Sequence, residues 1–103
     1  MTNEDKKKDN KKDNIIYVGS KDFMSYVNSV VMQFATMDQE EVIIKGRGKF
    51  ICRCVDVSEV AVKRFLVDKI NIISVTTDSE KFINNEKKEI NVSTISIVLG
   101  KCN

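Results

Sequence analysis

The sequence predicts an α+β domain of two layers, with the element order βαβαββ and a long hairpin between the last two strands. Two segments carry apolar residues at intervals of three and four, which is typical of amphipathic helices. Short runs rich in Ile and Val lie before, between and after them and predict strands. The length of 103 residues allows one domain with a modest core.

The first half of the chain predicts a strand, a helix and a second strand. Residues 14–18 (NIIYV) form a short apolar run that predicts a buried strand. Residues 22–37 have the periodicity of an amphipathic helix, and Ser20 or Asp22 is a suitable residue to cap it. Residues 41–45 (EVIIK) predict the second strand.

The second half predicts a helix followed by a hairpin. A short loop at 46–49 precedes a helix at 50–65. Residues 69–77 and 92–99 are β-branched and predict two strands, and the polar segment 78–91 joins them as a ribbon that does not pack on the core. The apolar stripe expected for the helix consists of Ile51, Val55, Ser58, Val62 and Phe65.

Composition excludes several classes of protein. Lys and Arg total 17 and Asp and Glu total 15, so the net charge of +2 does not by itself indicate nucleic-acid binding. The absence of His excludes a His-bearing zinc site, a Ser/His/Asp triad and a Cys/His dyad. Cys52, Cys54 and Cys102 lack C-x-x-C spacing and predict reduced thiols. We expect no cofactor, no signal peptide and no membrane segment.

The N-terminal segment differs from the rest of the chain. Residues 1–13 are rich in Lys, Asp and Asn, and Met1 is their only apolar residue, so they predict a disordered tail before a domain at 14–103. Two interpretations stay open. The tail is either a basic arm that contacts phosphate or a solvated segment whose acids neutralise its lysines.

The second helix has more apolar residues than one face needs. Val57 and Val60 lie away from its predicted stripe. Either the sheet covers both faces of the helix or a second subunit does. We expect a partner subunit at this surface.

Basic residues gather where strands lead into helices. Residues 45–49 (KGRGK) place three cations and two glycines before the second helix, and Lys21 lies at the corresponding junction before the first. Glycine allows a ligand to approach the backbone closely, and helix N-termini offer free N–H groups to phosphate. The loop is neither a Walker A motif nor G-x-G-x-x-G. The two junctions should emerge at one edge of the sheet and form a phosphate site, the alternative being a solvated turn.

The hairpin adds further lysines. Lys81, Lys87 and Lys88 lie on the polar ribbon, which is long enough to reach into the groove of a duplex. Neighbouring glutamates dilute their charge, so a solvated hairpin without a binding role is the alternative.

Four stretches carry a family resemblance: NIIYVGSKDFMSYV (14–27), EVIIKGRGKFICRCVD (41–56), RFLVDKINI (64–72) and VSTISIVL (92–99). Through them, residues 14–103 resemble Alba, a small chromatin and RNA-binding protein of archaea and many protists, and the chain looks like a short eukaryotic, protist-like member. The resemblance implies a fold similar to the C-terminal domain of translation initiation factor three. It also implies a dimer in which each subunit places a hairpin arm along the nucleic acid.

The resemblance also implies roles for individual residues. Lys21 matches the second of two adjacent lysines that bind DNA and are acetylated in archaeal members, whereas Ser20 replaces the first. Arg47 and Lys49 match basic loop positions, and Phe65 matches an aromatic residue that helps dimers associate side by side. The candidate contacts to nucleic acid are Lys21, Lys45, Arg47, Lys49, Arg53, Lys81, Lys87 and Lys88, and those between subunits or dimers are Val57, Val60 and Phe65.

The chain departs from the family in two further ways. Two prolines, usual near Asp22 and Val67, are missing. Lys87 and Lys88 stand at the hairpin tip where the family has Gly.

These observations predict a dimeric, sequence-independent DNA- and RNA-binding protein of chromatin type, in the nucleus and cytoplasm. Lys21 is its expected acetylation site, with a sirtuin-type deacetylase as a partner. The alternative is an RNA-binding subunit that works as a heterodimer with a related chain, as in ribonuclease P or ribonuclease MRP, or in messenger RNA regulation. Catalysis is not expected; the one chemistry left open is attack of a lysine on an abasic site.

Overall fold

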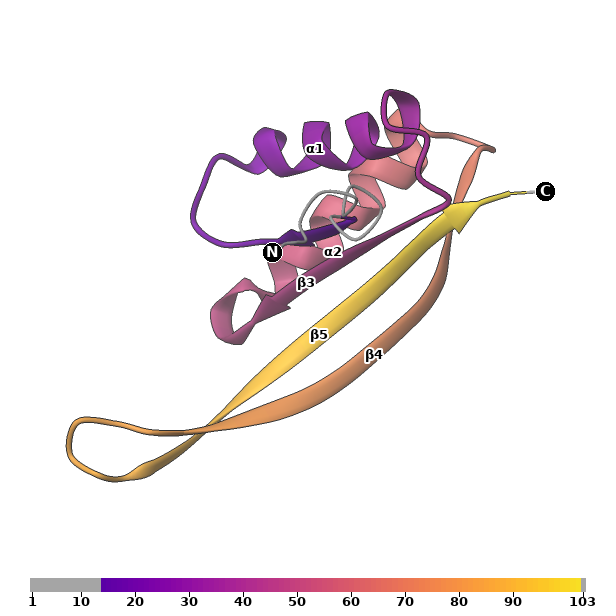
Figure 1. Cartoon of the computed structure of the whole chain (residues 1–103). Coiled ribbons are helices and arrows are strands. Elements are labelled where there is room, and N and C mark those ends of the chain that lie inside the picture. The colour runs from indigo at the N-terminus through magenta and orange to yellow at the C-terminus, as the bar shows by residue number, and fades with distance from the viewer. Residues whose placement is uncertain (1–13, 103) are drawn as a thin grey trace, which may run out of the picture.

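The computed structural model describes residues 14–102, in which a four-stranded sheet carries two helices on one face (Figure 1). The predicted order βαβαββ is confirmed, and the prediction for residues 1–13 lies outside the described residues. Neither helix is long and apolar enough to cross a membrane. The elements are β2 (Ile15–Tyr17), α1 (Phe23–Ala35), β3 (Glu41–Arg47), a 3₁₀ turn (Gly48–Phe50), α2 (Ile51–Val60), a π-helical turn (Ala61–Phe65), β4 (Ile70–Ile83) and β5 (Glu89–Lys101).

The sheet is mixed, with the strand order β2-β3-β5-β4. β2 and β3 are parallel, which is possible because α1 carries the chain back between them. β5 lies between β3 and β4 and is antiparallel to both. Ile44 of β3 pairs with Ile16 on one side and Ile97 on the other, so the three side chains form one row across the sheet.

The core lies between the sheet and the helices. Alternate strand residues point toward the helices, and α1 contributes its buried face to meet them. Complete burial of a Val, Leu or Ile side chain contributes about 1.5–3 kcal/mol, so these residues supply much of the driving force for folding. The completely buried members from the strands and α1 are Val27, Val30, Val42, Ile44 and Leu99.

The buried face of α2 differs from the predicted stripe. It consists of Cys54, Val57 and Ser58, and the π-helical turn continues it with Ala61 and Val62. The prediction that Val57 faces a partner subunit is therefore wrong, because its side chain is already completely buried within one chain. Small Cys and Ala side chains complete this face, and the apolar pattern of the sequence did not reveal them. Val55 of the predicted stripe is exposed, whereas Val60 is partly buried against the core.

The hairpin is longer than the two predicted strands. β4 has 14 residues and β5 has 13, and their pairing extends to Ile83 and Glu89 (Figure 1). At about 3.4 Å per residue, the ribbon is about 45 Å long. At its tip, Asn84 Oδ1 accepts hydrogen bonds from two backbone N–H groups. Lys87 has a φ of 63°, a left-handed conformation that Gly adopts without strain. A lysine therefore occupies a position of the turn where glycine is usual.

Gly46 marks a close contact between the sheet and α2. A Cβ at this position would collide with the Sγ of Cys54. Burial raises the pKa of the Cys54 thiol to about 11, so the group is a neutral packing residue at physiological pH.

We expect Gly46→Ala to lower the free energy of unfolding by about 1–3 kcal/mol, because the added methyl group overpacks this contact. Cys54→Ala removes the colliding sulfur atom, so Gly46→Ala should cost less in that background. Urea denaturation of the four proteins measures both costs. An equal cost in the two backgrounds would contradict this account of Gly46.

Candidate nucleic-acid interface

The parallel pairing of β2 with β3 brings two loops together at one edge of the sheet. The N–H of Val18, just after β2, donates to the carbonyl of Lys45 in β3 at 2.8 Å. Arg53 then joins α2 to the loop after β2, since its Nη1 donates to the carbonyl of Gly19 at 3.2 Å. The prediction that both strand-to-helix junctions emerge at one edge is confirmed.

Tyr26 of α1 shapes the loop that carries Lys21. Tyr26 is buried, and its hydroxyl oxygen accepts hydrogen bonds from the N–H groups of Gly19, at 2.9 Å, and Lys21, at 3.1 Å. The Arg53 guanidinium lies 6.0 Å from the centre of the Tyr26 ring, within the range of a cation–π contact. The role of Tyr26 was not evident from the sequence, because a Tyr on the apolar face of a helix resembles any other core residue.

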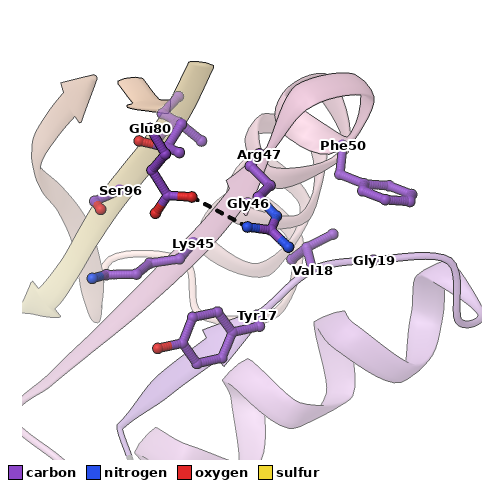
Figure 2. Close-up of a pocket in the computed structure, with 11 residues that line it drawn as sticks. Tyr17, Val18, Gly19, Lys45, Gly46, Arg47, Phe50, Glu80 and Ser96 are labelled. Carbon is purple, nitrogen blue, oxygen red and sulfur yellow. Dashed lines mark hydrogen bonds and ion pairs between the residues drawn. The ribbon is translucent and has the colours of Figure 1, made fainter. Parts of the chain in front are cut away.

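The cations of β3 lie on the sheet face opposite the helices. Val42 and Ile44 point into the core, so Lys45 and Arg47 point the other way. A cavity of about 500 Å³ opens on this face (Figure 2). Its lining includes Tyr17, Lys45, Arg47, Phe50, Glu80 and Ser96.

Arg47 connects the loop edge with the hairpin. Its Nη1 lies 3.1 Å from Oε1 of Glu80 on β4 (Figure 2), and its guanidinium lies 5.3 Å from the centre of the Phe82 ring. The Arg47 and Glu80 side chains are 60% and 51% exposed, so the ion pair contributes at most about 1 kcal/mol to stability. Glu80 therefore pairs with a cation that the sequence predicts to contact phosphate. The pairing was not evident from the sequence, because the two residues are 33 positions apart.

The other predicted lysines divide into two groups. Lys49 is exposed beside the cavity, with its Nζ 5.5 Å from the centre of the Phe50 ring, and Lys21 is exposed on the neighbouring loop. Lys81 lies 3.9 Å from Oε2 of Glu89 on the arm. Lys87 and Lys88 are exposed at the arm tip, far from the loops (Figure 1). The structure thus gathers Lys21, Lys45, Arg47, Lys49 and Arg53 and leaves the arm lysines apart.

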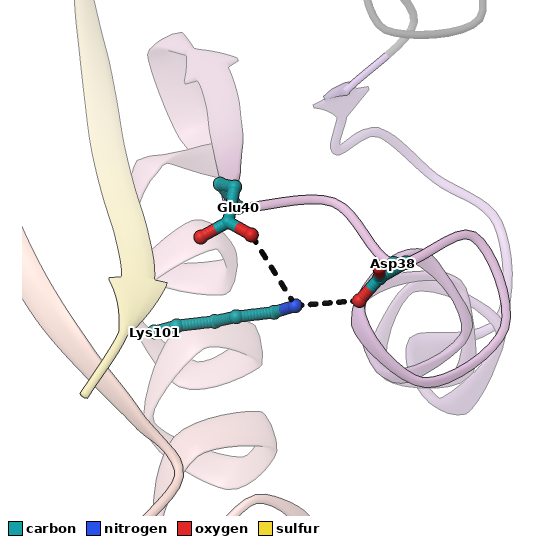
Figure 3. Close-up of polar contacts among 3 residues, drawn as sticks. All are labelled: Asp38, Glu40 and Lys101. Atoms are coloured by element: carbon teal, nitrogen blue, oxygen red, sulfur yellow. Dashed lines mark hydrogen bonds and ion pairs between the residues drawn. The ribbon is translucent and has the colours of Figure 1, made fainter. Parts of the chain in front are cut away.

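The opposite end of β3 is acidic. Asp38, Glu40 and Glu41 lie around the start of this strand, and Lys101 extends between the first two (Figure 3). Lys101 Nζ lies 2.6 Å from Asp38 Oδ1 and 3.7 Å from Glu40 Oε2. The hydrogen bond lowers the pKa of Asp38 and raises the pKa of Lys101, so both groups stay charged. One end of β3 therefore carries neutralised or acidic groups, and the other carries the cations.

Phe65 lies at the end of the π-helical turn, where its side chain is 50% exposed. Val67 follows it and is also exposed. Both side chains are available for a contact with another chain.

Comparison with known proteins shows the family of this chain. The sequence pattern of Alba matches residues 14–79. The chain belongs to the Alba family. It is 49% identical over 90 residues to the DNA/RNA-binding protein Alba of Methanococcus maripaludis, which covers 86% of this chain and 99% of that protein. It is 48% identical over 90 residues to the DNA/RNA-binding protein Alba of Methanoculleus marisnigri, covering 85% and 93%.

Solved structures show the same fold. Alba from Thermoplasma volcanium superposes with a TM-score of 0.75 at 37% identity, covering 84% of this chain and 98% of that one. ALBA1 from Trypanosoma brucei has a TM-score of 0.68 at 21% identity, covering 87% and 70%, and so shows the fold alone. The expectation of a protist-like member is not supported, because the two relatives at 49% and 48% identity come from archaea.

We expect Tyr26→Phe to lower the free energy of unfolding by about 1–3 kcal/mol, because two backbone donors lose their acceptor. Hydrogen exchange at the amides of Gly19 and Lys21 should accelerate. Tyr17→Phe is the matched control, since this ring is 70% exposed and loss of its hydroxyl should leave stability unchanged. Unchanged amide exchange in Tyr26→Phe would show that the hydroxyl does not hold the loop.

Proposed function

We propose that this protein binds DNA and RNA without sequence preference, through contacts to phosphate. The supporting observation is that five cations from two loops, β3 and α2 lie around one end of β3, with Glu80 paired to one of them, whereas Asp38, Glu40 and Glu41 lie around the opposite end. The chain aligns with almost the whole length of two relatives, and both are named DNA/RNA-binding protein Alba. Nothing in these relatives' names implies catalysis, and we propose none.

The cations at the end of β3 are placed to bind nucleic acid through its phosphates. Lys45 and Arg47 extend from a rigid strand, and Lys49 follows in a turn that begins at Gly48, whose φ is 57°. Any other residue would be strained at Gly48, so glycine permits this tight turn before α2. Side chains of Lys and Arg that contact phosphates read no base sequence. With 6–10 contacts per dimer, the affinity should fall by about 10³–10⁵ between 50 and 200 mM salt.

The functional unit in this proposal is a dimer of chromatin type. Phe65 and Val67 supply exposed apolar surface, with partly buried Val60 nearby on the same helical segment, for contacts between subunits or between dimers. Two copies would present two cation edges and two arms, and the arm lysines would contact phosphates further along the nucleic acid. The same surface would serve a heterodimer in a ribonucleoprotein. Sedimentation of the purified chain distinguishes these assemblies, since a stable homodimer that binds nucleic acid supports the first.

Regulation by acetylation at Lys21 is part of the proposal. The side chain is exposed, and Tyr26 holds the backbone at this position. Acetylation would remove the charge and one phosphate contact, and a sirtuin-type deacetylase would restore both.

We expect Lys45→Gln, Lys49→Gln and Lys21→Gln each to weaken binding several-fold and to reduce the salt slope by about 1 per chain. Fluorescence anisotropy of a labelled random duplex and a length-matched RNA, over a salt series, measures both quantities. Lys63→Gln is the control, because Lys63 pairs with Glu59 at 2.8 Å at the far end of the helical segment. Equal losses in all four variants would mean that net charge, rather than this edge, determines binding.

Glu80→Gln should strengthen binding, because it releases the Arg47 guanidinium for phosphate. An exposed ion pair is worth about 0.2–1 kcal/mol, which corresponds to a gain of about 1.5- to 5-fold. Glu86→Gln removes the same charge from the same arm, and Glu86 forms no ion pair within the described part of the chain, so it is the matched control. If the two variants bind equally, the Arg47–Glu80 pair does not compete with phosphate.

A further inference from the structure

Tyr17 is the most exposed aromatic side chain in the described part of the chain, and it lies in the cavity on the open face of the sheet. Its neighbours in the strand register are Lys45 on β3 and Ser96 on β5, so the three side chains form one row across the sheet. Arg47 and Thr94 form the next row. A ring, two cations, two hydroxyl groups and the Glu80 carboxylate that pairs with Arg47 therefore line one cavity. Figure 2 shows Tyr17, Lys45, Arg47, Glu80 and Ser96 around it.

This combination exceeds what phosphate binding requires. Phosphate needs cations and N–H donors, whereas an exposed aromatic face offers nothing to a phosphate oxygen. Base–aromatic stacking, in contrast, is the usual way in which proteins hold single strands on a sheet. The cavity of about 500 Å³ also falls in the range of sites that take small molecules.

We propose that this cavity binds an unpaired nucleobase, which stacks on Tyr17 while its flanking phosphates contact Lys45 and Arg47. The site thereby selects single-stranded segments, because the bases of a duplex are stacked on one another and cannot offer a face to the ring. The hydroxyls of Thr94 and Ser96 line the cavity and can hydrogen-bond to a base edge. The backbone of Gly19 and Gly46 also lines the cavity. This inference rests on the proposed function, since it assigns a substrate class to the same edge.

The test compares three labelled probes of equal length by fluorescence anisotropy: an oligouridine RNA, an abasic oligomer with the same number of phosphates, and a duplex. Wild-type protein should bind the oligouridine more tightly than the abasic oligomer. Tyr17→Ala should weaken oligouridine binding by about 5- to 100-fold and leave binding to the other two probes unchanged. Tyr17→Phe should retain wild-type affinity, because the stacking face remains.

Each other outcome is decisive. Equal wild-type affinity for oligouridine and the abasic oligomer overturns base stacking without relying on the folding of any variant. So does wild-type affinity of Tyr17→Ala for oligouridine. In both cases, weaker binding by Lys45→Gln would still support the proposed binding to phosphate. Absence of binding to all three probes overturns that function and this inference together.

Discussion

The parallel pairing of β2 with β3 is the constraint on which the rest of the molecule depends. Parallel neighbours cannot be joined by a tight turn, so α1 must cross the sheet between them and cover one of its faces. The same pairing places the carboxyl ends of both strands at one edge. The loops that follow, with Lys21 and Lys49, are therefore neighbours in space although α1 and β3 separate them in sequence.

Successive side chains along each strand point to opposite faces of the sheet, so the residues that stabilise the core and those proposed to bind nucleic acid lie on different faces. On β3, residues that point toward the helices form the core, and those that point away carry the cations of the open face. Substitutions on the open face can thus alter binding with little change in packing. Gly46 and Arg53 link the two functions, because one lies against Cys54 of α2 and the other joins α2 to the loop after β2.

Placement of charge matters more here than its total. A net charge of +2 gives little indication of a polyanion partner. Lys101 is engaged by Asp38 and Glu40 at one end of β3, whereas the cations at the other end face the cavity and solvent. Glu80 on the ribbon pairs with Arg47 and so reduces the positive charge of the group that faces the cavity. The ribbon therefore influences this edge of the sheet as well as extending from it.

The sequence by itself determined the order of the elements, the basic loop at 45–49, the junction at Lys21 and the family, because these features depend on residues close together in the chain. Only the tertiary structure decided which helix face is buried, since Cys54 and Ala61 are too small to mark a core by pattern. It also decided the partners of Arg47 and Tyr26 and the exposure of Tyr17. Arg47 and Glu80 are 33 positions apart, and the register between β3, β5 and β4 brings them together. Periodicity describes one segment at a time, whereas contacts of this kind depend on how several segments align.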